Sequence, residues 1–151
     1  MKWIYGKQDW KTLERGQENC WLMTNGLGGF SSLTMVGSVS RNDHALLMGC
    51  LKAPNCRYNF VHRLSELVKV EKNEYVISSQ EFADGTSENG YEYLEEFAYE
   101  DTPVWRFLVR GVQIRKEAVM KQKSNTVAVC YEISNRGLTR CTLSMTPSFQ
   151  F

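Results

Sequence analysis

The feature that most constrains the fold of this chain is a period-two alternation of apolar and polar residues along most of its length. Apolar residues recur at alternate positions in Thr126–Ile133, Trp105–Val109 and Val112–Met120, and Tyr58–Val70 is a further β-rich run. Because successive side chains of a β-strand point to opposite faces, this pattern is typical of strands with one buried face. The sequence predicts an all-β chain of about seven to nine strands.

Turn-forming residues separate several of these segments. Ser134–Gly137 lies between Thr126–Ile133 and Arg140–Thr146, so we expect these two segments to form a hairpin. Ala83–Gly85 and Ser87–Gly90 are predicted as further turns.

Helical signal is confined to Asp9–Arg15, where Asp9 is a candidate N-cap and Gly16 a candidate end of the helix. A doubly wound sheet needs crossover helices, and the chain has no segments that supply them. Two antiparallel sheets packed face to face remain. We predict an antiparallel β-sandwich with at most one short N-terminal helical turn.

Length and composition limit the class of protein. The 151 residues are 42% hydrophobic and fit one domain, 1–151, with a single core. The 18 basic and 17 acidic residues nearly balance, so the chain has no strongly positive potential to attract a phosphate backbone. We therefore expect no nucleic-acid partner. No apolar run approaches ~20 residues and no secretory signal is present, so we expect no membrane partner. Five cysteines without CxxC spacing favour free thiols in a reducing cytoplasm.

Asn25–Gly29 is the most unusual short motif, with the sequence Asn-Gly-Leu-Gly-Gly. Glycine-rich phosphate loops lead into a helix, whereas the following Phe30–Val36 is strand-like. On the residues alone, positive φ angles in a tight turn or a close approach of two backbone segments explain the glycines better.

His44 and His62 have no neighbour at metal-ligand spacing, so we predict no metal site. The tryptophans and tyrosines offer rings on which sugars stack, although a sandwich needs most of them in its core.

Cys20–Ser32 resembles the opening signature of a known family. It reads Cys-Trp-Leu-Met-Thr-Asn-Gly-Leu-Gly-Gly-Phe-Ser-Ser and is similar to the N-terminal domain of prokaryotic-type glycogen debranching enzymes, the amylo-α-1,6-glucosidase family. Arg41–Leu47 resembles the second element of that family, in the same order along the chain. This segment differs from the family pattern at Asn42, Asp43 and Ala45.

The resemblance implies a β-sandwich of the mutarotase-like supersandwich type, followed by a helical toroid that carries the catalytic carboxylates. Residues 1–151 contain no such toroid, so the chain is expected to be the N-terminal part of a longer protein and to position substrate without cleaving it. The implied partners are an α-glucan, glycogen or a maltooligosaccharide, and the C-terminal catalytic domain of the same polypeptide. No metal or organic cofactor is implied. The implied substrate-binding or domain-interface residues are Asn25, Gly26, Gly28, Gly29, Arg41 and His44.

Two alternatives involve no catalysis. A stand-alone carbohydrate-binding module needs aromatic platforms exposed on one face. A structural docking domain needs an apolar contact surface, for which Phe149 and Phe151 are the candidates.

Overall fold

The computed structural model describes residues 1–53, 55–137 and 139–150, so Phe151 lies outside the described residues. Within these ranges the chain forms fourteen strands, and their pairings are all antiparallel. The predicted all-β sandwich is confirmed. The expected number of strands was too low, because four of the strands are only three or four residues long. No helix in the described part of the chain is long and apolar enough to cross a membrane.

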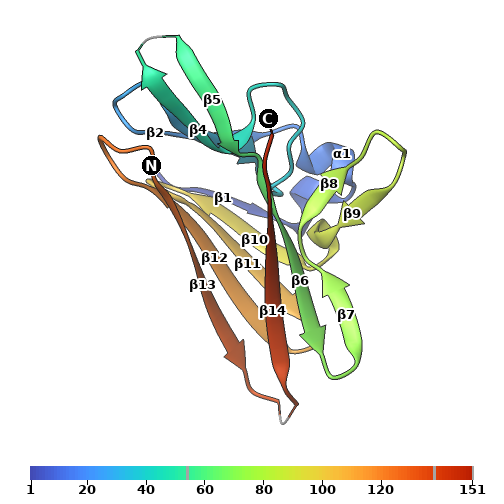
Figure 1. Ribbon diagram of the computed structural model, residues 1–151. Coiled ribbons are helices and arrows are strands. Elements are labelled where there is room, and N and C mark those ends of the chain that lie inside the picture. Colours follow the sequence, from blue (N-terminus) through green and yellow to red (C-terminus); the bar gives the residue numbers. More distant parts are fainter. Residues whose placement is uncertain (54, 138, 151) are drawn as a thin grey trace.

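One layer, here called the back sheet, has the order β1-β10-β11-β12-β13 (Figure 1). Its strands are Trp3–Gly6 (β1), Leu94–Tyr99 (β10), Pro103–Val109 (β11), Val112–Met120 (β12) and Val127–Asn135 (β13). The predicted alternation holds on β11 and β12, where one face is buried. Trp105 at its centre is 1% exposed, and its ring centroid lies 5.5 Å from that of Phe97 on β10.

The facing layer, the front sheet, has the order β14-β6-β7 and crosses in front of the back sheet in Figure 1. Its strands are Arg63–Val70 (β6), Asn73–Val76 (β7) and Cys141–Ser148 (β14). The predicted hairpin of Thr126–Ile133 with Arg140–Thr146 is therefore wrong. β13 pairs with β12 and β14 pairs with β6, because the chain between them passes from one layer to the other.

A third, upper sheet has the order β2-β3-β4-β5 and lies at one end of the sandwich (Figure 1). Its strands are Cys20–Thr24 (β2), Phe30–Thr34 (β3), Ala45–Lys52 (β4) and Cys56–Val61 (β5). The run Tyr58–Val70 is divided between β5 and β6, since the chain leaves the upper sheet at His62. The N–H of Leu46 donates to the carbonyl of His62 at 3.1 Å and joins the two sheets there.

The remaining elements are short. Ser79–Glu81 (β8) and Ser87–Asn89 (β9) form a hairpin, so Ser87–Gly90 is mostly strand instead of the predicted turn. The turn at Ala83–Gly85 is confirmed, with φ of +87° at Gly85. The helices are Lys7–Trp10 (η1), Leu13–Gly16 (α1) and Gly90–Glu92 (η2).

The N-terminal helical turn differs in detail from the prediction. Its expected N-cap, Asp9, lies inside η1 and accepts a hydrogen bond from the N–H of Gly6 at 2.9 Å. Thr12 caps α1 instead, because its hydroxyl accepts the N–H of Arg15 at 3.2 Å.

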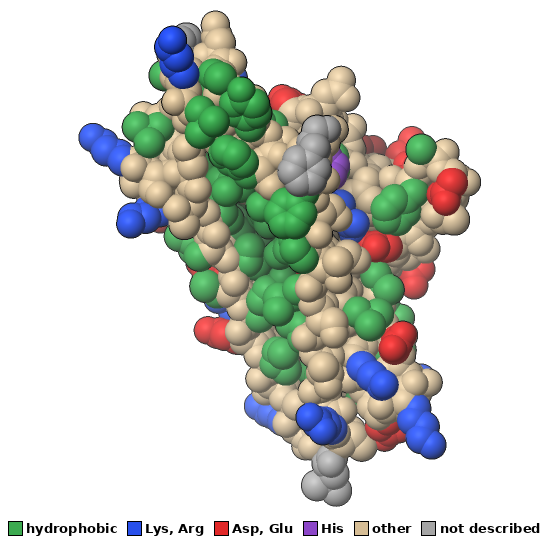
Figure 2. Space-filling model, viewed as in Figure 1, with side chains coloured by type: hydrophobic (Ala, Val, Ile, Leu, Met, Phe, Trp, Pro, Cys, Tyr) green, Lys and Arg blue, Asp and Glu red, His purple; other side chains and the backbone are tan. Residues whose placement is uncertain are grey.

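The sandwich is open along one side, between β13 and β14 (Figure 1). Figure 2 shows apolar side chains along this face. We call Val129, Ile133, Leu143 and Met145 the side stripe; Ile133 and Met145 are 45% and 49% exposed. Within the described ranges, β13 and β14 each pair with a strand on one edge only.

Candidate functional site

The loop that joins β2 to β3 is organised around the side chain of Asn25, which is fully buried. Its Oδ1 accepts the N–H groups of Leu27 and Gly29 at 2.9 and 3.0 Å. Its Nδ2 donates to the carbonyl of Ser124 at 3.0 Å and to Oδ1 of Asn125 at 2.9 Å. The oxygen and the nitrogen of the Asn25 amide therefore both fix the loop, and neither is left to bind a ligand.

The glycines of this loop have the conformational role expected from the sequence. Gly26 and Gly28 have φ angles of +76° and +87°, which favour glycine. A Cβ on Gly29 would lie 2.6 Å from Nδ2 of Asn25 and 2.9 Å from the carbonyl oxygen of Met48. Backbone segments thus approach too closely for any larger residue.

His44 holds the loop that precedes β4. The side chain is buried, and its Nδ1 accepts the N–H of Ser40 at 3.1 Å. Burial lowers the pKa of His44; Asp43 opposes this and Arg41 adds to it. A neutral ring that accepts at Nδ1 carries its proton on Nε2. His44 therefore bonds within its own turn, and we infer that it keeps its neighbour Arg41 in place.

Arg41 is exposed on the wall of a cleft of about 840 Å³, here called the Arg41 cleft. The polar side chains that line it come from five separate parts of the chain. They are Gln17, Ser40, Arg41, Asn42, His62, Glu81 and Gln150, and the aromatic ring of Phe82 lines the same cleft.

One amide positions two of these groups. Nδ2 of Asn59 lies 3.0 Å from Nδ1 of His62 and donates to Oε1 of Gln150 at 3.0 Å. Since an amide nitrogen only donates, His62 accepts at Nδ1 and carries its proton on Nε2. Burial, with a smaller contribution from Arg63, lowers the pKa of His62 and keeps the ring neutral at pH 7.

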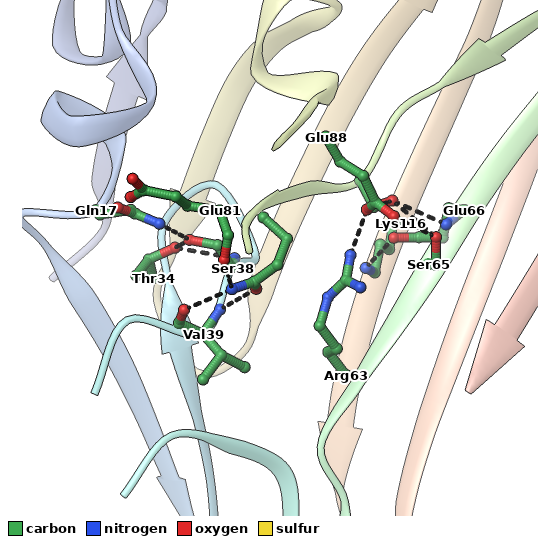
Figure 3. Close-up of polar contacts among 12 residues, drawn as sticks. Gln17, Thr34, Ser38, Val39, Arg63, Ser65, Glu66, Glu81, Glu88 and Lys116 are labelled. Carbon is green, nitrogen blue, oxygen red and sulfur yellow. Dashed lines mark hydrogen bonds and ion pairs between the residues drawn. The ribbon is translucent and has the colours of Figure 1, made fainter. Parts of the chain in front are cut away.

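The wall beside Arg41 is fastened to β8. Oε1 of Gln80 accepts the N–H of Val39 at 2.8 Å, and Nε2 of Gln80 donates to the Val39 carbonyl at 2.9 Å. Gln17 donates from Nε2 to the hydroxyl of Ser38 at 3.2 Å (Figure 3). This loop is therefore held by the side chains of Gln80 and Gln17, and Arg41 extends from a fixed backbone.

Phe82 is held beside a buried ion pair. Arg63 pairs with Glu88, which also accepts the hydroxyls of Ser65 and Ser78 at 2.9 and 2.6 Å (Figure 3). Burial alone raises the pKa of Glu88, but the Ser78 hydroxyl and Arg63 outweigh it and the pKa is lowered. The Arg63 guanidinium lies 5.8 Å from the centroid of the Phe82 ring.

The predicted site residues do not form one site. Gly26, Gly28 and Gly29 line a second hollow of about 590 Å³, together with Asp43 and Arg57. Arg57 donates from Nε to the carbonyl of Gly28 at 2.9 Å. Arg41 faces the Arg41 cleft instead, whereas Asn25 and His44 are buried supports.

Sequence reasoning missed His62, Glu81, Phe82 and Gln150 as lining residues of the Arg41 cleft. No spacing rule connects these positions to Arg41, because they lie after β5, at the end of β8 and after β14, and only tertiary packing brings them together.

Comparison with known proteins decides the family. A family model described as glycogen debranching enzyme N terminal matches residues 19–151. The chain belongs to this family. The match agrees with the resemblance drawn from Cys20–Ser32 and Arg41–Leu47. No curated protein and no solved structure matches the chain.

Among the residues that the structure describes, neither of the two hollows above brings two carboxylates together. Glycoside hydrolysis uses a pair of carboxylates on either side of the scissile bond. Among the described lining residues of the Arg41 cleft, Glu81 is the single carboxylate. Among those of the second hollow, it is Asp43. Over the described ranges, no three His, Cys, Asp or Glu side chains are grouped to hold a metal ion, and the five thiols are free.

Proposed function

We propose that this chain is the N-terminal domain of a longer cytoplasmic protein and positions an α-glucan, while the remainder of that protein hydrolyses the α-1,6 branch links. The observation that carries the proposal is the place of Arg41 in a polar cleft, in a chain whose family match covers residues 19–151. Residues 1–151 are one domain in this proposal.

The lining of the Arg41 cleft suits a sugar. Planar side chains such as those of Arg41, Asn42 and Gln150 present pairs of polar atoms, and neighbouring sugar hydroxyls both donate and accept hydrogen bonds. Phe82 is 39% exposed and offers an apolar surface for the face of a pyranose ring. Glu81 adds an acceptor for a hydroxyl group.

The side stripe supports a scaffolding role. Exposed contiguous apolar surface marks contact sites for other proteins or domains. We propose that the catalytic part of the parent protein covers this face, since Val129 and Leu143 on two different layers would then be buried together.

Binding of maltoheptaose and glycogen, measured by titration calorimetry, tests the role of the cleft. We expect Arg41→Ala and Phe82→Ala each to weaken binding about fivefold or more, as loss of a central contact does. Arg136→Ala is the matched control, because Arg136 is also exposed but lies after β13, away from the cleft lining. Equal affinities for the wild-type chain and both cleft variants would refute the proposal.

A further inference from the structure

A third hollow, here called the aromatic hollow, lies where β1 and β10 of the back sheet meet β2 of the upper sheet. Its volume is about 290 Å³. Trp3, Tyr5 and Tyr99 line it together with the buried rings of Trp21 and Phe97. β1 precedes residue 19, where the family match begins, so Trp3 and Tyr5 are features of this chain outside that match.

Strand pairing brings these rings together. Antiparallel pairing of β1 with β10 places Trp3 opposite Tyr99 and Tyr5 opposite Phe97. Trp3 is 54% exposed, whereas the other three tryptophans are at most 4% exposed. The core therefore does not account for the exposed indole of Trp3.

The hollow also carries unused hydrogen-bonding groups but no charge. The indole N–H of Trp3, the hydroxyl of Tyr5 and the side-chain amide of Asn19 have no hydrogen-bond partner in the part of the chain that the structure describes. Tyr99 is fixed, because its hydroxyl donates to the carbonyl of Leu22 at 2.6 Å. The described lining contains no Lys, Arg, Asp or Glu.

We propose that the aromatic hollow binds a short stretch of α-glucan, as a second site separate from the Arg41 cleft. Aromatic rings with polar edges suit a ligand that has one apolar face and many hydroxyls, and the lack of charge selects a neutral ligand. The hollow, of about 290 Å³, lies at the lower limit of ligand pockets, which span roughly 300–1,000 Å³, so it suits a short segment of the glucan. The identity of the sugar rests on the proposed function, whereas the location rests on the hollow itself.

Iodide quenching of tryptophan fluorescence tests the site in the wild-type chain. Trp3 is the exposed indole, so quenching by iodide reports on Trp3, and Trp3→Phe should remove most of it. We expect maltotriose to protect Trp3 from iodide. Unchanged quenching at saturating maltotriose would overturn the proposal.

Calorimetry with maltotriose adds a matched pair of variants on one strand. We expect Trp3→Ala to weaken binding about fivefold or more and Ile4→Ala to leave it unchanged. Ile4 is 59% exposed but points to the other face of β1. Equal weakening by both variants would overturn the proposal, because it would show a general effect of β1.

Arg41→Ala separates this inference from the proposed function. Protection of Trp3 that persists in Arg41→Ala supports a second site. If Arg41→Ala abolishes glucan binding and maltotriose does not protect Trp3 from iodide, the proposed role of the Arg41 cleft is supported. The proposed site in the aromatic hollow is then refuted.

Discussion

At the residue scale, two buried polar side chains determine the shape of the loops around the Arg41 cleft and the second hollow. Asn25 satisfies four backbone and side-chain groups with one amide, and His44 bonds to the backbone of the Arg41 loop. The Asn-Gly-Leu-Gly-Gly pattern indicated the tight turn in advance. It did not indicate Ser124 and Asn125, which lie about 100 positions away in the sequence and complete the hydrogen bonds of Asn25.

Asn25→Asp tests the role of the amide with almost no change in shape. The new carboxylate oxygen would face the carbonyl of Ser124 and Oδ1 of Asn125, both of them acceptors. We expect a loss of about 2–3 kcal/mol in the free energy of unfolding in urea. Ser124→Ala is the control, because it keeps the backbone carbonyl. A loss in Asn25→Asp no larger than that of Ser124→Ala would contradict the account.

His44 should make stability depend on pH. Burial lowers the pKa of His44 in the folded chain, so below its ordinary value of 6.5 the unfolded chain binds a proton that the folded chain does not. The free energy of unfolding should then fall as the pH drops below about 6.5 and stay level above it. His44→Gln should flatten this slope in urea unfolding measured at several pH values. An unaltered slope would show that His44 does not titrate in this way; His62→Gln gives the separate contribution of the other imidazole.

At the element scale, β6 links the two layers through a buried charged group. Nζ of Lys116 on β12 lies 2.7 Å from Oε1 of Glu66 on β6, and the hydroxyl of Tyr131 on β13 donates to the other oxygen at 2.5 Å (Figure 3 shows the ion pair). Lys116 also lies 4.9 Å from the Trp105 ring centroid. Lys116 lies on the buried face of β12, between the apolar residues Ile114 and Ala118, and its charge is paired there.

Lys116→Met should be strongly destabilising. It leaves the Glu66 carboxylate buried without its cation, which costs about 3–5 kcal/mol. The double variant Lys116→Met/Glu66→Leu should recover part of this loss, because both charges are gone although the Tyr131 hydroxyl loses its acceptor. Urea unfolding of the two single variants and the double variant measures the coupling. Additive losses would mean that the pair does not act as a unit.

The local sequence pattern predicted where strands form, but it did not predict which strands pair with each other. Period two predicted which residues of β11 and β12 are buried, because burial depends on the alternating direction of neighbouring side chains. It could not show that β13 and β14 belong to different layers, since that depends on the contact of β14 with β6. The same limit applies to the Arg41 cleft, whose lining comes from residues as distant as Gln17 and Gln150.

At the scale of the whole molecule, the open side of the sandwich is the main departure from a closed core. The side stripe leaves apolar surface of both layers in contact with solvent (Figure 2). Dyes such as ANS bind exposed apolar surface. We expect the native 151-residue chain to bind ANS, and Ile133→Ser and Met145→Ser to reduce the fluorescence. Val119→Ser, on the outer face of the back sheet and 39% exposed, should leave it unchanged. Equal reduction in all three variants would place the dye elsewhere.

The partnership of β14 with β6 sets an order for folding. Its paired residues lie roughly 70 to 85 positions apart, so the intervening polypeptide must loop back before any bond of this ladder forms. Pairings of such long range slow folding. During synthesis β13 leaves the ribosome before β14. The back sheet can therefore form before β14 pairs Ser148 with Arg63. We expect closure of the front sheet to be a late event in the folding of these residues.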